Sequence, residues 1–387
     1  MRKALLLAAM IGLAFLTAGC WDIKSLQDVN YFTGIGIDYK DGKYEVYIQQ
    51  LDFASVAKSE SGGKSDKPSV IWIGQAEGDS ISDAVVELYQ TTQQTVFWGH
   101  LNAILLSENL LKNGDLLGVF DSLIRFPEIR YTPWVYGTNK SIDQLFMTKP
   151  FFNLSPFNSI LHSPETNYAQ RPNIEPVRLS RLIREVREPG QTALLPSLAV
   201  TEHSWKRDEK PDPKLEIDGV FALRNTSYLA KLPDDKVLGT RWVSNPKTGS
   251  RILLREEGRS VAALRFTKPR TEVRIRMDKG EPVFDLDVKA AASIIELWEM
   301  KSEKTFEQMA SRHIQEQIRK TYQYASSVDV DVYDLEHLFY RKRYKEWNRI
   351  TSGGKIPLRP IRFGDVRVDV RIVQSGMYKM KRKMNPY

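Results

Sequence analysis

Cysteine is nearly absent from this chain of 387 residues, in which Cys20 is the only one. A single thiol cannot form an internal disulfide, and zinc sites built from several cysteines and histidines are excluded. Two histidine ligands from one helical turn are not available either, because the five histidines are far apart: His100, His162, His203, His313 and His337. We therefore predict neither a metal site nor a cofactor.

Long apolar runs are missing beyond the N-terminus. The one unbroken run, Ala4–Phe15, is about a dozen residues, whereas a membrane-spanning helix needs roughly 20. A short basic start, Met1-Arg2-Lys3, precedes this run, and small residues follow it. That order is typical of a secretory signal peptide. We assign residues 1–19 to such a signal.

The signal ends in Leu16-Thr17-Ala18-Gly19-Cys20, which is similar to a lipobox. Thr17 departs from that pattern, since an aliphatic residue is usual there. Two other interpretations stay open: an uncleaved anchor, or an ordinary signal with a chance cysteine. Exported proteins commonly use cysteines in pairs as disulfides, so a lone cysteine at this position favours lipidation. We predict cleavage before Cys20 and attachment of diacylglycerol to its sulfur, which would tether the chain to a lipid bilayer.

Charge of one sign is not strongly in excess. Loss of Arg2 and Lys3 with the signal lowers the formal net charge from +8 to +6. This balance suits anionic lipid headgroups, and it is also common in proteins with no special partner. The densest basic run, Lys379–Lys383, is interpreted as a solvated end. Nucleic acid is not an expected partner, because the signal exports the chain.

Catalytic motifs are missing as well. The chain has no Gly-x-Ser-x-Gly motif, and Gly34-Ile35-Gly36 lacks the third glycine of a dinucleotide-binding loop. Glu336-His337 lacks the spacing of a metalloprotease helix. The carboxylates Glu296, Glu299 and Glu303 are typical of a solvated face, and His313 of a structural role. We predict no catalytic residue and no enzymatic activity.

Residues 20–140 are predicted to form an N-terminal α+β domain. Strands are expected at 31–38 and 43–53, joined by the hairpin signal Asp41-Gly42, because glycine tolerates the positive φ that the turn requires. The polar segment Lys58–Pro68 is expected to be a loop. Asp79 and Ser80 are the cap candidates of one helix, and Asp115 is expected to cap a second. Three further strands are predicted: 69–76, 103–106 and 132–136.

Residues 141–205 are predicted to be an irregular middle region or small domain. Nine of the 19 prolines fall between Ser141 and Pro213, which argues against long regular elements. One helix is expected at 177–188. The charged segment 206–214 is the predicted linker.

Residues 215–387 are predicted to form a C-terminal α+β domain. Alternation of apolar and polar residues indicates an antiparallel meander of strands followed by a returning strand near the end. The predicted strands are 215–223, 251–255, 260–267, 271–277, 283–289 and 366–372. Between the last two, a long helix carries an apolar stripe that is expected to cover the sheet; its members are Phe306, Met309, Ala310, Ile314, Ile318, Tyr322 and Ala325. The chain as a whole is therefore α+β with two to three domains.

Several segments together resemble the Ger(x)C family, the C-subunit lipoproteins of spore germinant receptors. The resemblance covers nearly the whole mature chain, and it is most specific at 329–335 and 344–347. The other matching segments are Gly19-Cys20-Trp21-Asp22, Gly34-Ile35-Gly36-Ile37-Asp38, Phe97-Trp98-Gly99-His100, Ile104-Leu105-Leu106 and Ile217-Asp218-Gly219-Val220-Phe221. Tyr333-Asp334-Leu335-Glu336 departs from the family, which usually has a Phe-Gly-x-Gly-like turn there.

The resemblance implies a receptor subunit that is not an enzyme, with three mixed α+β domains. It implies partners as well: an A-type subunit with membrane and soluble parts, and a B-type subunit similar to amino-acid transporters. The implied location is the outer face of the spore's inner membrane. Two rival functions are a solute-binding lipoprotein that feeds a transporter and a lipoprotein enzyme that acts on envelope polymers.

Overall fold

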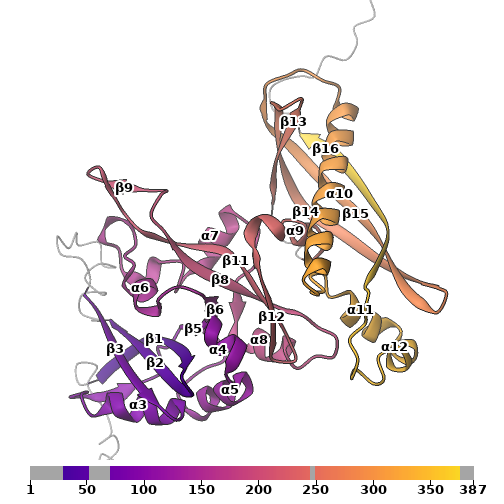
Figure 1. Ribbon diagram of the computed structural model, residues 1–387. Helices are drawn as coiled ribbons and strands as arrows, with labels where there is room; N and C mark the ends of the chain where they lie inside the picture. Colours follow the sequence, from indigo (N-terminus) through magenta and orange to yellow (C-terminus); the bar gives the residue numbers. More distant parts are fainter. Residues whose placement is uncertain (1–28, 52–69, 245–248, 375–387) are drawn as a thin grey trace, which may run out of the picture.

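The computed structural model describes residues 29–51, 70–244 and 249–374, and places them in two large β-sheets with helices packed on them and a small two-stranded sheet (Figure 1). The α+β architecture that the sequence predicts is confirmed. Three predicted features lie outside the described residues: the lipidated start at Cys20, the polar loop 58–68 and the basic tail 379–383.

Within the described residues, the first sheet has ten strands in the order β12-β11-β8-β6-β5-β1-β2-β3, with β4 beside β1 and β7 beside β6. The strands are β1 (Val29–Lys40), β2 (Lys43–Leu51), β3 (Ile71–Gly78), β4 (Thr95–Phe97), β5 (Ala103–Ser107), β6 (Trp134–Thr138), β7 (Val177–Arg178), β8 (Ala193–Thr201), β11 (Lys214–Arg224) and β12 (Ser227–Pro233). The β1–β2 hairpin is confirmed: Lys40 pairs with Lys43, and Asp41 and Gly42 have φ of 51° and 83°.

Helices cover both faces of this sheet. They are α3 (Ile81–Tyr89), α4 (Glu108–Asn113), α5 (Leu116–Arg125), α6 (Ile142–Met147), α7 (Pro164–Gln170) and α8 (Leu179–Glu185), with the short 3₁₀ turns η2 (Phe151–Asn153) and η3 (Pro156–Asn158). The two predicted caps are confirmed, since the Ser80 and Asp115 side chains accept hydrogen bonds from the backbone N–H of Asp83 and Leu117. One face packs on α3, α4, α5 and α8, and α6 covers the other.

Gly34 and Gly36 are explained by the packing of α6. A Cβ at Gly36 would lie 2.4 Å from Ile142 Cγ2, and one at Gly34 would lie 2.9 Å from Phe146 Cε1. Both Ile142 and Phe146 belong to α6, so the two glycines allow the helix to approach β1 closely. The glycines serve packing, in agreement with the absence of a nucleotide-binding loop.

The segment 206–214 differs from the predicted linker. It is the tip of a long hairpin, in which β9 (Lys206–Arg207) pairs with β10 (Lys210–Pro211) and Lys214 of β11 pairs with Thr201 of β8. The middle region contributes β7 and β8 to the first sheet. Linkers and solvated hairpin tips have the same polar composition, so composition alone cannot distinguish them. The pairing between strands identifies this segment as a hairpin tip.

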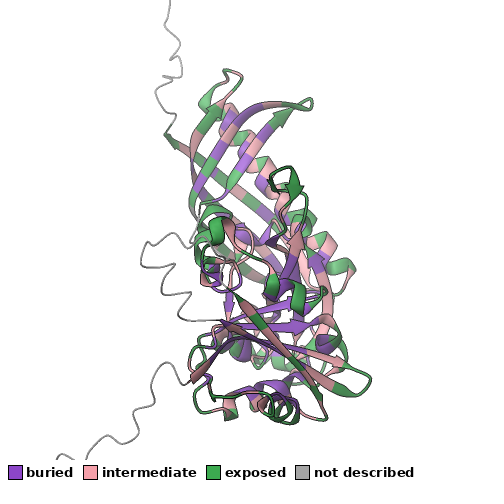
Figure 2. Cartoon of the chain, turned by 90° about the vertical axis from the view of Figure 1, so that its left-hand side faces the viewer, coloured by how far each residue is buried: buried purple, intermediate pink, exposed green. Residues whose placement is uncertain are grey.

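The second sheet has the order β13-β14-β15-β16. Its strands are β13 (Arg251–Glu256), β14 (Arg259–Asp278), β15 (Glu281–Leu297) and β16 (Arg362–Gln374), and the remaining helices are η4 (Asp234–Lys236), α9 (Thr240–Val243), α10 (Glu303–Ser327), α11 (Leu335–Lys342) and α12 (Tyr344–Ile350). Buried and exposed residues alternate along the strands, seen as colour bands in Figure 2.

Two predictions about this sheet were wrong in detail. Residues 260–267 and 271–277 form one strand, β14, which is irregular between Thr267 and Arg270 because Pro269 has no amide hydrogen to donate. Only β13, β14 and β15 form the antiparallel meander, since 215–223, predicted as its first strand, belongs to β11 of the first sheet. The last strand, β16, is parallel to β15, with Val288 paired to Val368, because α10, α11 and α12 carry the chain back to the other end of the sheet.

Helix α10 covers the second sheet as predicted. Its buried residues are Phe306, Ala310, Ile314, Ile318, Thr321 and Ala325. The same core also contains Val220, Ala222 and Leu232, which belong to β11 and β12 of the first sheet. The two sheets therefore share apolar packing where they meet.

Candidate functional site

The predicted lipidation residue, Cys20, lies nine residues before Val29, where β1 begins. Nine residues of extended chain reach at most about 30 Å. The end of the first sheet at which β1 begins is therefore held within that distance of any lipid attached to Cys20. We call this end of the first sheet the entry end.

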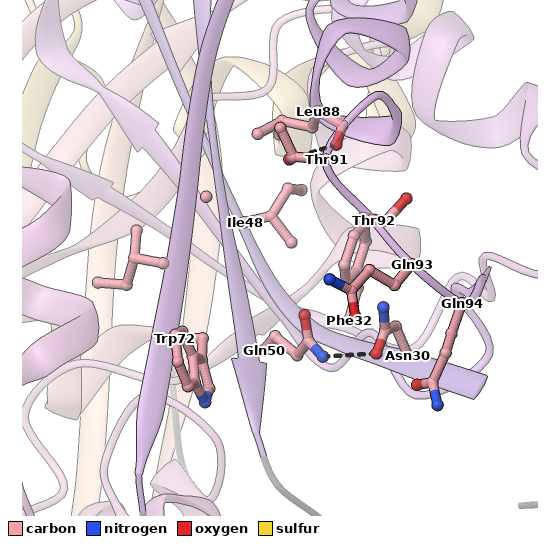
Figure 3. Close-up of a pocket in the computed structure, with 12 residues that line it drawn as sticks. Asn30, Phe32, Ile48, Gln50, Trp72, Leu88, Thr91, Thr92, Gln93 and Gln94 are labelled. Carbon is pink, nitrogen blue, oxygen red and sulfur yellow. Dashed lines mark hydrogen bonds between the residues drawn. The ribbon is translucent and has the colours of Figure 1, made fainter. Parts of the chain in front are cut away.

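A hollow of about 500 Å³ opens at the entry end, between the sheet and the loop that follows α3 (Figure 3). The hollow forms because α3 is shorter than the strands that it covers. The helix ends at Tyr89, and the part of the sheet beyond it is left uncovered. Asn30, Gln50 and Trp72 come from three adjacent strands and form its floor. One wall is made by the loop residues Thr91, Thr92, Gln93 and Gln94.

The described residues that line this hollow carry no charge. Gln50 Nε2 donates a hydrogen bond to Asn30 Oδ1 at 2.9 Å, and Trp72 is 64% exposed. Amide, hydroxyl and indole groups can bind a neutral polar molecule, but none of them is a general acid or base near neutral pH. The hollow is suited to binding rather than to catalysis.

A buried carboxylate lies where the two sheets meet. Glu336 of α11 is fully buried, and its Oε1 atom accepts hydrogen bonds from Arg224 Nη2 at 2.7 Å and Trp347 Nε1 at 3.3 Å. Its Oε2 atom accepts from the backbone N–H of Leu358 at 2.9 Å. Arg224 ends β11 of the first sheet, so this ion pair joins the two parts of the molecule. We call it the junction.

Two more contacts cross the junction. The Asp334 Oδ1 atom accepts a hydrogen bond from the backbone N–H of Thr192 at 2.8 Å, and His337 Nδ1 donates to the Pro189 carbonyl at 3.0 Å. Burial raises the pKa of the Asp334 carboxyl well above its ordinary value, and the nearby Asp331 charge adds to this effect. Burial also raises the pKa of Asp331 to about 6. These contacts hold elements together, and Asp331 and Arg224 also line a cavity of about 290 Å³ beside the junction.

Arg241 makes a further link at the same boundary. Its Nη1 atom donates to Asn173 Oδ1 at 3.2 Å and its Nη2 atom to Gln317 Oε1 at 3.0 Å. Asn173 precedes β7, and Gln317 belongs to α10. Because the guanidinium is buried, its pKa is lowered to about 10, so it stays cationic at neutral pH.

A second buried polar cluster surrounds His162. Its Nε2–H donates to Gln49 Oε1 at 2.8 Å, and its Nδ1 atom lies beside the Asn102 side-chain amide. Gln49 Nε2 in turn donates to the Phe146 carbonyl of α6 at 2.9 Å. Burial lowers the pKa of His162 to about 3, so the ring is neutral. This cluster ties α6 to the sheet.

The other candidate residues named from the sequence do not lie together in one site. His313 Nε2 lies 3.0 Å from the Gln317 amide on the same helix, and burial lowers its pKa. Glu296, Glu299 and Glu303 lie near the end of β15 and the start of α10. In the part of the chain that the structure describes, no group of three or more metal-ligating side chains is assembled. Likewise, none of the described helices is both long and apolar enough to cross a bilayer.

Sequence reasoning did not find the hollow or the junction. The departure Tyr333-Asp334-Leu335-Glu336 was the one available signal, since it contains two of the junction carboxylates. It could not identify their partners, because Thr192 and Arg224 lie more than a hundred residues away in sequence.

Comparison with known proteins gives matches along most of the chain. Residues 22–200 match the sequence profile of the "Spore germination protein N-terminal domain", and residues 218–376 match that of "Spore germination B3/ GerAC like, C-terminal". The gap between the two matches falls at the β9–β10 hairpin tip.

Relatives of similar length are also found. "Spore germination protein KC" of Bacillus subtilis (strain 168) is 23% identical, and the alignment covers 97% of each chain. "Spore germination protein B3" of the same organism is 23% identical over 76% of each chain. A solved structure, "Crystal Structure of the GerBC protein", aligns with a TM-score of 0.54 at 17% identity, covering 91% of this chain and 100% of that one. This structural likeness supports the fold.

Proposed function

The chain belongs to the Ger(x)C family of spore germination proteins, and from this premise we propose that it is a lipid-anchored subunit of a nutrient germinant receptor. The observation that carries the proposal is that both family profiles match in order along the chain. The relative "Spore germination protein KC" supports it over 97% of both chains. The hollow is lined by no acid or base, and the junction carboxylates are engaged in contacts with other elements, so the role we propose is not enzymatic.

Lipidation at Cys20 would supply the membrane anchor. A single acyl chain gives only marginal membrane binding, whereas two chains hold a protein stably, and a diacylglyceryl group carries two. A tether also raises the local concentration of the folded domains near membrane partners, so that weak contacts persist. The described residues themselves provide no spanning helix, which makes the anchor the proposed means of attachment.

The proposed partners are an A-type and a B-type receptor subunit, and the proposed location is the outer face of the spore's inner membrane. The names "Spore germination protein B3" and "Spore germination protein A3", carried by two relatives from one organism, support membership of a receptor assembly. We do not favour the rival solute-binding lipoprotein. Its two lobes of alternating strands and helices are unlike the β13–β15 meander, and the named relatives are germination proteins.

The anchor is tested by Cys20→Ala in sporulating cells. We expect the variant to accumulate as an unprocessed precursor or to leave the membrane fraction, because the thiol that accepts the lipid is gone. Immunoblots of membrane and soluble spore fractions, with germination assays on the same spores, would measure this. Normal retention together with normal germination would show that Cys20 is not the anchor.

The assembly is tested by recovering the tagged chain from spore membranes and identifying bound membrane proteins. We expect a transporter-like subunit together with an A-type companion. Recovery of an ATP-driven permease in their place would support the solute-binding function and contradict ours.

A further inference from the structure

Large apolar side chains are gathered at the surface where α6 leads into η2. Met147 is 55% exposed, Phe152 90% and Trp205, on the β8–β11 hairpin, 53%. Together with Phe151 they line one groove of about 920 Å³. We call these four residues the aromatic rim. Exposed apolar residues gathered in one place commonly mark an interaction surface.

The backbone holds Phe152 outward at a conformational cost. Phe152 and Asn153 have φ of 56° and 53°, in the left-handed region that few residues other than glycine, asparagine and aspartate adopt readily. The neighbouring Phe151 is held in place by two contacts. Its ring packs edge-on against Trp205 with 4.8 Å between the ring centroids, and Lys214 Nζ lies 4.7 Å from the Phe151 centroid, over the ring. A strained loop that exposes a phenyl ring is a feature to explain, because burial of the ring would have been more favourable.

The rim lies toward the entry end of the first sheet. Ile142 packs beside Gly36 and Phe146 beside Gly34, so α6 runs antiparallel to β1 and Met147 leads toward the end where β1 begins. Trp72 and Val70, 64% and 52% exposed, flank the start of β3 at that end. In Figure 1, α6, the β9 hairpin and the start of β3 all lie on the left-hand side of the molecule.

We propose that the aromatic rim inserts into the interface of a lipid bilayer and orients the first sheet on the membrane. The proposal rests on the proposed function only in that Cys20 would hold the entry end near the same bilayer. Tryptophan suits this occupant because its amphipathic ring is enriched at the headgroup level of membranes, and phenylalanine is common on the apolar face of segments that bind in the membrane interface. Lys149, Lys206 and Arg207 line the same groove and can extend toward phosphate groups.

Insertion of apolar groups, rather than charge attraction, is the expected driving force. Three carboxylates, Asp143, Asp208 and Asp212, line the groove together with the cations, and Asp212 Oδ1 pairs with Lys214 Nζ at 2.8 Å. Because these charges nearly balance, binding should persist on neutral phosphatidylcholine vesicles and at high salt.

The test uses the mature chain without its anchor, as the Cys20→Ser variant, in sedimentation with phosphatidylcholine vesicles. We expect the Met147→Ser/Trp205→Ser pair to weaken vesicle binding by about tenfold, since two partly inserted side chains lose apolar contact. The matched control is Trp298→Ser/Met300→Ser, which removes the same residue types at 52% and 59% exposure beside the second sheet. Circular dichroism would verify that both pairs fold.

A second measurement reports on the loop tip itself. Cys20 is the only cysteine, so Phe152→Cys in the Cys20→Ser chain can carry a single environment-sensitive fluorophore. We expect its emission to shift to shorter wavelength on vesicles, whereas the same label on Trp298→Cys should not respond.

The proposal is overturned if the anchorless chain does not bind vesicles, if both serine pairs weaken binding equally, or if the label at 152 stays in water. Loss of partner recovery from spores by the rim pair, without any effect on vesicle binding, would assign the rim to a protein contact instead. These outcomes are independent of whether Cys20 is lipidated, because the chain under test carries no lipid.

Discussion

Burial decides the role of the titratable residues at the scale of single side chains. His162, Asp331 and Asp334 all have pKa values shifted toward their neutral forms, and each makes hydrogen bonds with backbone or amide groups. Shifted pKa values often mark catalytic sites. Here burial within structural contacts is the main cause of all three shifts, and of the three groups Asp331 also lines a cavity of about 290 Å³.

The stability of the fold should depend on His162 below neutral pH. Its pKa is about 3 when folded and near the ordinary 6.5 when unfolded, so protons bind the unfolded chain preferentially between these values. Stability is therefore fully present above 6.5 and falls as the pH is lowered toward 3. We expect His162→Gln to lose less stability than wild type between about pH 7 and about pH 4, measured by thermal unfolding.

The exposed His203 provides the control for this experiment. His203→Gln should follow the wild-type pH dependence, since its ring lies at the surface. Asp331 titrates in an overlapping range with the opposite sign, but it is present in all three chains and cancels in the comparison. Identical pH profiles for wild type and His162→Gln would refute the assignment of a buried neutral ring.

At the scale of elements, short sequence patterns correctly predicted the features that depend on neighbouring residues alone. The β1–β2 turn, the caps at Ser80 and Asp115 and the apolar stripe of α10 each depend on residues that are close in sequence. The predicted helix 177–188 shows the limit of such patterns. Its first two residues form β7, which pairs with β6, and the helix α8 ends at Glu185. Pairing with a distant strand replaced the expected helical turn.

The close contact of α6 with β1 gives a prediction at this scale. Gly36→Ala should lower the free energy of unfolding by about 1–3 kcal/mol, because the added methyl group meets Ile142 Cγ2 in a packed core. Chemical denaturation would measure the change. The double variant Gly36→Ala/Ile142→Ala should lose less stability than the sum of the losses in the two single variants, since truncation of Ile142 makes room for the methyl group. Simple additivity would contradict the packing described.

At the scale of the whole molecule, the two sheets are joined by apolar packing and by a buried ion pair. Val220, Ala222 and Leu232 of the first sheet belong to the core beneath α10, and Glu336 binds Arg224 across the same boundary. The β9–β10 tip, where a linker was predicted, therefore does not separate independent parts. The relative orientation of the sheets is set by this shared core.

The junction predicts a large effect from a small substitution. Glu336→Gln should destabilise the fold by about 3 kcal/mol, because it leaves the Arg224 guanidinium, only 14% exposed, without its counter-charge. Glu346→Gln, which removes the partner of Arg343 at the surface, should have a much smaller effect, because solvent screens that pair. Urea unfolding of the two variants would compare them, and similar losses would argue against a desolvated ion pair.

The sequence by itself determined the fold class, most of the element types and the family, because these depend on composition, periodicity and short motifs. It also predicts the lipid anchor at Cys20, a prediction that lies outside the described residues. Only the tertiary structure decided that 206–214 is a hairpin tip, that β16 is parallel to β15, and that Glu336 meets Arg224. The physical reason is sequence distance: strand partners and buried counter-charges are chosen by packing between segments far apart in the chain.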